Sequence, residues 1–136
     1  MPTDTPDIIR EWARTIPRGS SILNLGSDER VPIARVLTDE GFTMYGVDAP
    51  AIEDSEFFNR TFDGVIALGV MSGLPPPMQS IVIGKVSRAL RRGGKFLFTA
   101  PQHAAREYQR VLRDQGMLMV GEQSDDEHTY YFAVKG

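Results

Sequence analysis

Residues 21–48, SILNLGSDERVPIARVLTDEGFTMYGVD, contain one complete strand–helix–strand unit. Residues 21–25 are short and mostly apolar and run directly into Gly26, which is typical of a buried parallel strand. Residues 31–40 repeat apolar side chains at helical spacing, and residues 42–47 form a second strand pattern. Two parallel strands need a crossover of this kind between them. We therefore expect a parallel βαβ unit here.

The same alternation continues on both sides of this unit. Residues 5–16 predict an amphipathic helix, and the following residues predict, in order, a strand at 62–70, a helix at 78–91, a strand at 95–100, a helix at 103–115 and a hairpin of strands at 117–122 and 128–134. We expect the helix at 78–91 to bury Ile81, and Gly93-Gly94 to turn the chain before the next strand. Strands alternating with helices predict a Rossmann-like, doubly wound α/β fold. Its sheet is expected to be mostly parallel with a C-terminal antiparallel hairpin, and residues 1–136 to form one domain.

Composition excludes several classes of function. The chain has 136 residues, 41% hydrophobic and 24% charged, with no cysteine and a formal net charge of -3. Disulfides, thiolate metal sites and cysteine nucleophiles are therefore excluded. The basic residues are scattered apart from a cluster at 88–95, which we interpret as the solvated end of a helix rather than a phosphate-binding patch, so no nucleic-acid partner is expected.

Neither a membrane span nor a signal peptide is evident in the sequence. No apolar run approaches the roughly 20 residues that span a bilayer. Residues 1–7 carry two acidic residues and no basic one, unlike a signal peptide. We expect a cytoplasmic protein.

The ends of the first two strands carry the candidate ligand-binding residues. In open α/β sheets, ligands bind outside the carboxyl ends of the strands, where the winding reverses. That rule selects the turn Gly26-Ser27-Asp28 and, roughly 20 residues on, Asp48 at the end of the next strand. Gly26 permits close approach of the backbone to a ligand, and the Asp48 carboxylate can accept hydrogen bonds from both ribose hydroxyls of a nucleotide. The alternative for Asp48 is a cap or turn residue before Pro50.

These segments together resemble class I S-adenosylmethionine-dependent methyltransferases. The resemblance covers nearly the whole chain and is carried by Ile22–Asp28, Ala34–Leu37, Gly46–Asp48, Phe62–Val70, Val86–Thr99 and the terminal helix and hairpin. It implies that S-adenosylmethionine is the cofactor and that Leu68 and Gly69 contact it together with Gly26, Ser27, Asp28 and Asp48.

The chain departs from that family's pattern in two places. Members usually carry Gly-x-Gly-x-Gly after the first strand, whereas here Asp28 and Arg30 stand where glycines are expected. An acidic Asp28 can still pair with the ammonium group of the methionine tail. Members also have a helix and a third strand between the second and fourth, and residues 49–61 are too short for both. We therefore expect a sheet that lacks the usual third strand.

Methyl transfer needs positioning more than a compact catalytic motif. His103 is the candidate general base, with Met71, Ser72 and Gln102 also expected near the crevice; the alternative for His103 is an exposed side chain in the first turn of a helix. The acidic turn before His128 is interpreted as an exposed hairpin turn rather than a metal site.

Three functional hypotheses follow from the sequence. The leading one is methyl transfer from S-adenosylmethionine to a small-molecule acceptor. The second is a non-catalytic binding or assembly module that has the fold but has lost cofactor binding. Without a third strand, residues 42–47 become an exposed apolar edge through which a homodimer can form. The third hypothesis, a nicotinamide-dependent oxidoreductase, would need a richer glycine fingerprint.

Overall fold

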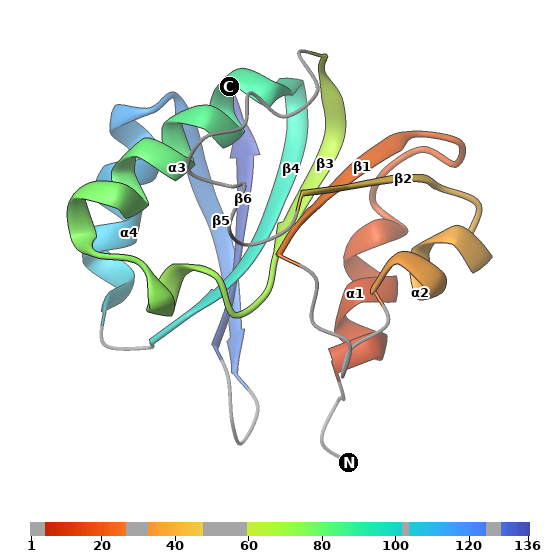
Figure 1. Cartoon of the computed structure of the whole chain (residues 1–136), viewed down its shortest axis with the longest axis horizontal. Helices are drawn as coiled ribbons and strands as arrows, with labels where there is room; N and C mark the ends of the chain where they lie inside the picture. The colour runs from red at the N-terminus through yellow and green to blue at the C-terminus, as the bar shows by residue number, and fades with distance from the viewer. Residues whose placement is uncertain (1–4, 27–32, 48–59, 102–103, 125–128) are drawn as a thin grey trace.

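The computed structural model describes residues 5–26, 33–47, 60–101, 104–124 and 129–136. Its elements follow the order α1 (Thr5–Ala13), β1 (Ser21–Leu25), α2 (Ile33–Asp39), β2 (Thr43–Val47), β3 (Phe62–Ala67), η3 (Met71–Gly73), α3 (Pro76–Ala89), β4 (Leu90–Ala100), α4 (Ala105–Asp114), β5 (Met117–Ser124) and β6 (Thr129–Lys135). Within the described part, helices and strands alternate up to the final hairpin, except that β3 is the next described element after β2 (Figure 1).

The sheet has six strands in the order β2-β1-β3-β4-β6-β5. The pairs β1–β2, β1–β3 and β3–β4 are parallel, whereas β4–β6 and β5–β6 are antiparallel. This confirms the expected Rossmann-like sheet with its C-terminal antiparallel hairpin. The winding reverses at β1, because the chain places β2 on one side of β1 and then β3 on the other. No strand is assigned between β2 and β3 within the described ranges.

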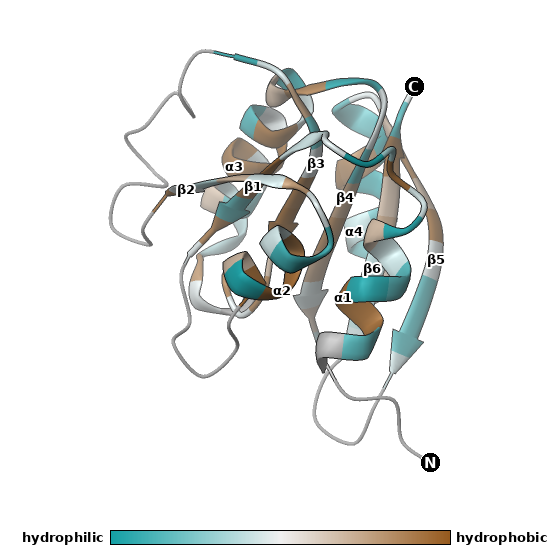
Figure 2. Ribbon diagram, turned by 90° about the vertical axis from the view of Figure 1, so that its right-hand side faces the viewer, coloured by the Kyte–Doolittle hydropathy of each residue, from teal (hydrophilic) through white to brown (hydrophobic). Residues whose placement is uncertain are grey.

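Helices cover both faces of the sheet. One hydrophobic cluster joins the sheet to α3 and α4 through residues such as Val82 and Leu112, and a second joins it to α1 and α2 through residues such as Ile9 and Leu37. The neighbours Ile22 and Leu23 of β1 belong to opposite clusters, as the pleat of a strand requires. Figure 2 shows the hydrophobic central strand β3 behind α1 and α2.

Helix α1 is amphipathic, as predicted, and its apolar side is almost fully buried. It lies close to the sheet at Gly64 of β3. A Cβ atom at Gly64 would lie 3.0 Å from Cη2 of Trp12 and 2.9 Å from Cδ1 of Ile16. A glycine is therefore needed on β3 for the indole ring to reach the sheet.

The structure corrects the expected boundaries around α3. The helix begins at Pro76 rather than Met78, since proline suits the first turn of a helix. Ile81 is 50% exposed rather than buried. The inward residues are Val82, Ile83 and Val86, and at 100° per residue Ile81 lies on the opposite side of the helix.

Strand β4 starts at Leu90 rather than at Lys95. Leu90 pairs with Phe62 of β3, and the register then shifts so that Lys95 pairs with Gly64. The intervening residues bulge, with Gly93 at a φ of 79°. Gly93-Gly94 thus interrupts a strand instead of turning the chain before one.

Within the described ranges, none of the helices combines the length and apolar character that a membrane span requires.

Candidate functional site

The candidate site lies where β1, β2 and β3 end. β1 has β2 on one side and β3 on the other, and all three run in the same direction. Leu25 at the end of β1 is in register with Val47 at the end of β2. The ends of β1 and β2 therefore lie side by side, as predicted. Folds of this kind bind ligands at the carboxyl ends of the strands where the winding reverses, which here is at β1.

Gly26 ties the end of β1 to the end of β2. Its N–H donates to the carbonyl oxygen of Val47 at 2.7 Å, and the residue is buried. Its φ of 74° lies in the left-handed region, which glycine adopts at little cost. Gly26 is therefore held against the residue that immediately precedes Asp48.

Gly69 makes the corresponding turn after β3. Its φ is 73°, and its N–H donates at 2.7 Å to Oγ1 of Thr99, a buried residue of β4. A Cβ atom at Gly69 would meet no heavy atom within 4 Å. Because its amide is already bonded, Gly69 offers a ligand its open Cα side rather than a hydrogen-bond donor. Leu68 is half-buried beside it and packs against the cluster under α1 and α2.

Asn24 is a candidate site residue that the sequence reasoning missed. It is 8% exposed, and no described group donates a hydrogen bond to its Oδ1 atom. Since Ile22 packs under α1 and α2, Asn24 lies on that same face of β1, two residues before Gly26. A buried carbonyl oxygen without a donor is costly, and a ligand N–H or O–H can satisfy it. The signal in the sequence was a polar residue between the apolar residues Leu23 and Leu25 of the strand.

The loop after β3 is fixed by a network from α3 and α4. Nε2 of Gln79 donates to the carbonyl oxygens of Met71 and Leu74, both at 2.8 Å. The hydroxyl of Tyr108 in turn donates to Oε1 of Gln79 at 2.9 Å. Met71 is fully buried, so its side chain belongs to the core and does not line the crevice as the sequence suggested.

A second tyrosine fixes the segment after β4. The hydroxyl of Tyr131 donates to the carbonyl oxygen of Pro101 at 2.9 Å.

Burial, reinforced by the negative charge of Glu107, raises the pKa of Tyr108. Burial raises the pKa of Tyr131 as well, with Glu122 and then Tyr108 adding to the effect. Both phenols therefore remain protonated donors at neutral pH.

Several predicted site residues lie outside the described ranges. These are Ser27, Asp28, Asp48, Gln102 and His103, and the side chain of Ser72 is likewise not described. The expected hairpin turn before His128 also lies outside them. Of the residues expected to contact a cofactor, the structure describes Gly26, Leu68 and Gly69. Gly26 and Gly69 follow the neighbouring strands β1 and β3.

Solved structures share this fold, although no protein-family model and no curated protein sequence matches the chain. A TehB-like SAM-dependent methyltransferase from Corynebacterium glutamicum is 17% identical, with a TM-score of 0.78 over 94% of this chain and 86% of that one. The CcbJ methyltransferase from Streptomyces caelestis is 12% identical, with a TM-score of 0.82 over 99% and 91%.

A third neighbour was solved with ligands. It is the 1,6-didemethyltoxoflavin-N1-methyltransferase from Burkholderia thailandensis, with bound 1,6-didemethyltoxoflavin and S-adenosylhomocysteine. It is 16% identical, with a TM-score of 0.76 over 96% of this chain and 76% of that one. The strand order, the glycine turns at its centre and these neighbours agree: the chain has the fold of class I S-adenosylmethionine-dependent methyltransferases.

Proposed function

We propose that this protein transfers a methyl group from S-adenosylmethionine to a small-molecule acceptor. One observation carries the proposal: Gly26, the buried Asn24 and Gly69 gather where β1 and β3 end and the winding reverses. The fold supports it, and so does the Burkholderia thailandensis neighbour, which was solved with bound 1,6-didemethyltoxoflavin and S-adenosylhomocysteine.

The described residues suit such a cofactor. No described group donates to Oδ1 of Asn24, and an ammonium or hydroxyl group of a nucleoside-type ligand can do so. Gly26 and Gly69 carry no side chains that would block the approach, and the space beside Gly69 is open. We assign the ribose hydroxyls to Asp48, which follows the strand end that Gly26 contacts. We assign the amino-acid tail to Ser27 and Asp28, and one wall of the site to Leu68.

The chain's own residues contribute positioning and exclusion of water. When bound, S-adenosylmethionine supplies a methyl group attached to a positively charged sulfur. Once the methyl group is transferred, the leaving group is the neutral thioether. The Gln79 and Tyr108 network holds the loop after β3 in place, so that the acceptor and the methyl group can be aligned. For an acceptor that must lose a proton, we assign the general base to His103.

The cofactor proposal is tested by thermal unfolding in the presence of S-adenosylhomocysteine. Saturation at 100 times the dissociation constant adds about 2.7 kcal/mol to the free energy of unfolding. We expect Asp48→Ala to abolish most of this shift, and the matched control Asp39→Ala, on the exposed side of α2, to keep it. The absence of a shift at millimolar ligand would favour the alternative, a non-catalytic module with this fold. A shift that persists in Asp48→Ala would refute the ribose assignment alone.

We further propose that copies of this chain associate through β2. Among the described strands β2 pairs with β1 alone, and Met44 and Tyr45 are partly exposed. Phe42 and Val47, in contrast, are buried within the chain, so this edge is less apolar than its sequence suggests. Sedimentation of wild type against Met44→Lys tests the idea: we expect a dimer that the substitution dissociates. A monomer in both refutes it.

A further inference from the structure

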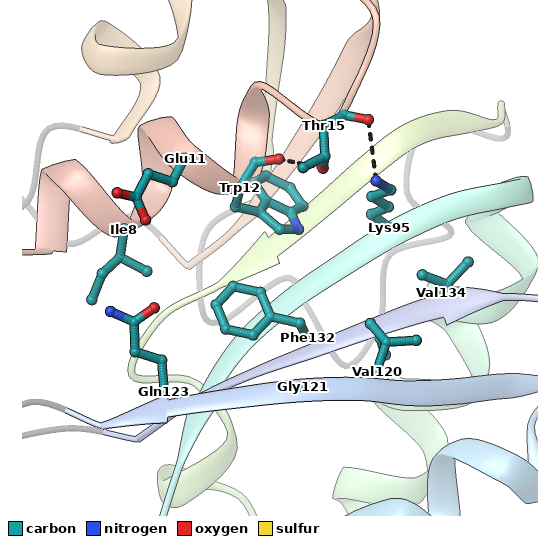
Figure 3. Close-up of a pocket in the computed structure, with 11 residues that line it drawn as sticks. Ile8, Glu11, Trp12, Thr15, Lys95, Val120, Gly121, Gln123, Phe132 and Val134 are labelled. Atoms are coloured by element: carbon teal, nitrogen blue, oxygen red, sulfur yellow. Dashed lines mark hydrogen bonds between the residues drawn. The ribbon is translucent and has the colours of Figure 1, made fainter.

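A cavity lies between α1 and the C-terminal hairpin. It has a volume of about 330 Å³ and is enclosed by α1 on one side and by β4, β5 and β6 on the other (Figure 3). Ligand pockets begin at about this size. Its lining residues belong to α1 and the turn after it, to β4 and to the hairpin of β5 and β6, whereas the proposed methyl-transfer site lies where β1 and β3 end. The two sites are therefore distinct.

One wall of this cavity is apolar and incompletely covered. Phe132 and Val134 of β6 are half-buried, and Val120 of β5 is 59% exposed. Leu118 is 63% exposed and lies opposite Val134 on the same face of the hairpin. An apolar ligand body lying along this wall would remove part of that surface from water, which is favourable.

The opposite wall presents a buried donor that lacks an acceptor. Trp12 is 5% exposed, and none of the described groups accepts a hydrogen bond from its Nε1 atom. Its Cη2 atom is held against Gly64, and Figure 3 shows Nε1 on the edge of the ring that faces Phe132 and Val120 across the cavity. Buried N–H groups are nearly always paired, so an acceptor placed in the cavity next to Nε1 would satisfy this donor.

The charges around the cavity select the kind of acceptor. Nζ of Lys95 donates to the carbonyl oxygen of Thr15 at 3.1 Å, which holds the ammonium group at one end of the cavity. Glu11 lies at the other end, beside Ile8 (Figure 3). An anionic group is therefore attracted to the Lys95 end and repelled from the Glu11 end.

We propose that this cavity binds a small carboxylic acid with an apolar body. One carboxylate oxygen accepts the hydrogen bond from Nε1 of Trp12, and the carboxylate pairs with the ammonium group of Lys95. The apolar body lies along Phe132, Val120 and Val134. The proposal does not depend on methyl transfer.

The test uses Trp12 as its own reporter, because it is the only tryptophan of the chain. We would titrate the full-length protein with 4-phenylbutyrate while recording tryptophan fluorescence. We expect saturation with a Kd below about 1 mM, and binding about tenfold weaker for the uncharged 4-phenylbutyramide. Lys95→Met should raise the Kd for 4-phenylbutyrate about tenfold. Lys95→Arg keeps the charge, so its Kd should stay within about threefold of the wild-type value.

A second variant removes the other contact. Trp12→Phe keeps an aromatic side chain of smaller size and lacks Nε1, and its binding is measured by calorimetry after circular dichroism has shown that it folds. We expect Trp12→Phe to bind 4-phenylbutyrate more weakly than the wild type does. Three results overturn the proposal: no saturation up to about 10 mM acid, equal binding of acid and amide, or unchanged binding in Lys95→Met. S-adenosylhomocysteine is titrated in parallel, and we expect Lys95→Met to leave its thermal shift unchanged, which separates this site from the proposed function.

Discussion

Gln79 of α3 is expected to be the side chain on which the loop after β3 most depends. It donates to the carbonyl oxygens of Met71 and Leu74 and accepts from Tyr108, so Gln79→Ala removes three hydrogen bonds. Each contributes about 0.5–1.5 kcal/mol net. The N–H of Leu74 still donates to the carbonyl oxygen of Met71 in the variant, which limits the damage there. We therefore expect Gln79→Ala to lower the free energy of unfolding by about 2–3 kcal/mol, and Tyr108→Phe to lower it by about 1 kcal/mol.

A double-mutant cycle in urea separates this network from general packing. Once Gln79 is alanine, Tyr108→Phe removes no further bond to it, so the two effects should fall short of additivity by about 1 kcal/mol. The control Ser80→Ala, at the next position of α3, should change stability by less than about 0.5 kcal/mol. Because the loop borders the proposed site, Gln79→Ala should also weaken binding of S-adenosylhomocysteine. A loss below about 0.5 kcal/mol for Gln79→Ala, or strictly additive effects, would refute the reasoning.

Two further predictions concern packing and pH. Gly64→Ala places a methyl group 3.0 Å from Cη2 of Trp12, so we expect overpacking to cost about 1–3 kcal/mol in urea unfolding and to shift the tryptophan emission; a neutral substitution would contradict the contact. The raised pKa of Tyr108 and Tyr131 means that their contribution to stability is complete below about pH 10, the pKa in the unfolded chain, and is lost as the pH rises through the higher folded values. Stability measured between pH 9 and 12 should therefore fall, and the fall should be smaller in Tyr131→Phe; identical profiles would contradict the assignment.

Periodicity predicted the fold well, because burial repeats with the period of each element. The apolar run at 21–25, the helix pattern before Gly41 and the final hairpin all lie where expected. Ile81 and the start of β4 were predicted wrongly for a shared reason. Tertiary packing, rather than the local sequence pattern, decides which side of α3 faces the sheet. It also decides that Leu90 pairs with Phe62 of β3.

The candidate site was predictable only in outline. The rule on strand ends located Gly26, and the resemblance to class I methyltransferases located Gly69; both have a positive φ, which glycine adopts at little cost. Asn24 was missed because a polar residue in a strand does not reveal whether its oxygen finds a donor. The cavity beside Trp12 could not be predicted from local sequence, because it lies between α1 and a hairpin more than a hundred residues later in the chain.

The central claim is that a nucleoside-type cofactor binds where β1 and β3 end, and amide chemical shifts test it most directly. Addition of S-adenosylhomocysteine to the isotope-labelled protein should shift the amide signals of Gly26 and Gly69 in a saturable way. The amide signals of Gly19 and Gly116 should stay in place, because these residues precede the starts of β1 and β5, at the opposite ends of the strands. Signals of Gly26 and Gly69 that do not move at millimolar ligand, or shifts confined to Gly19 and Gly116, would contradict the account.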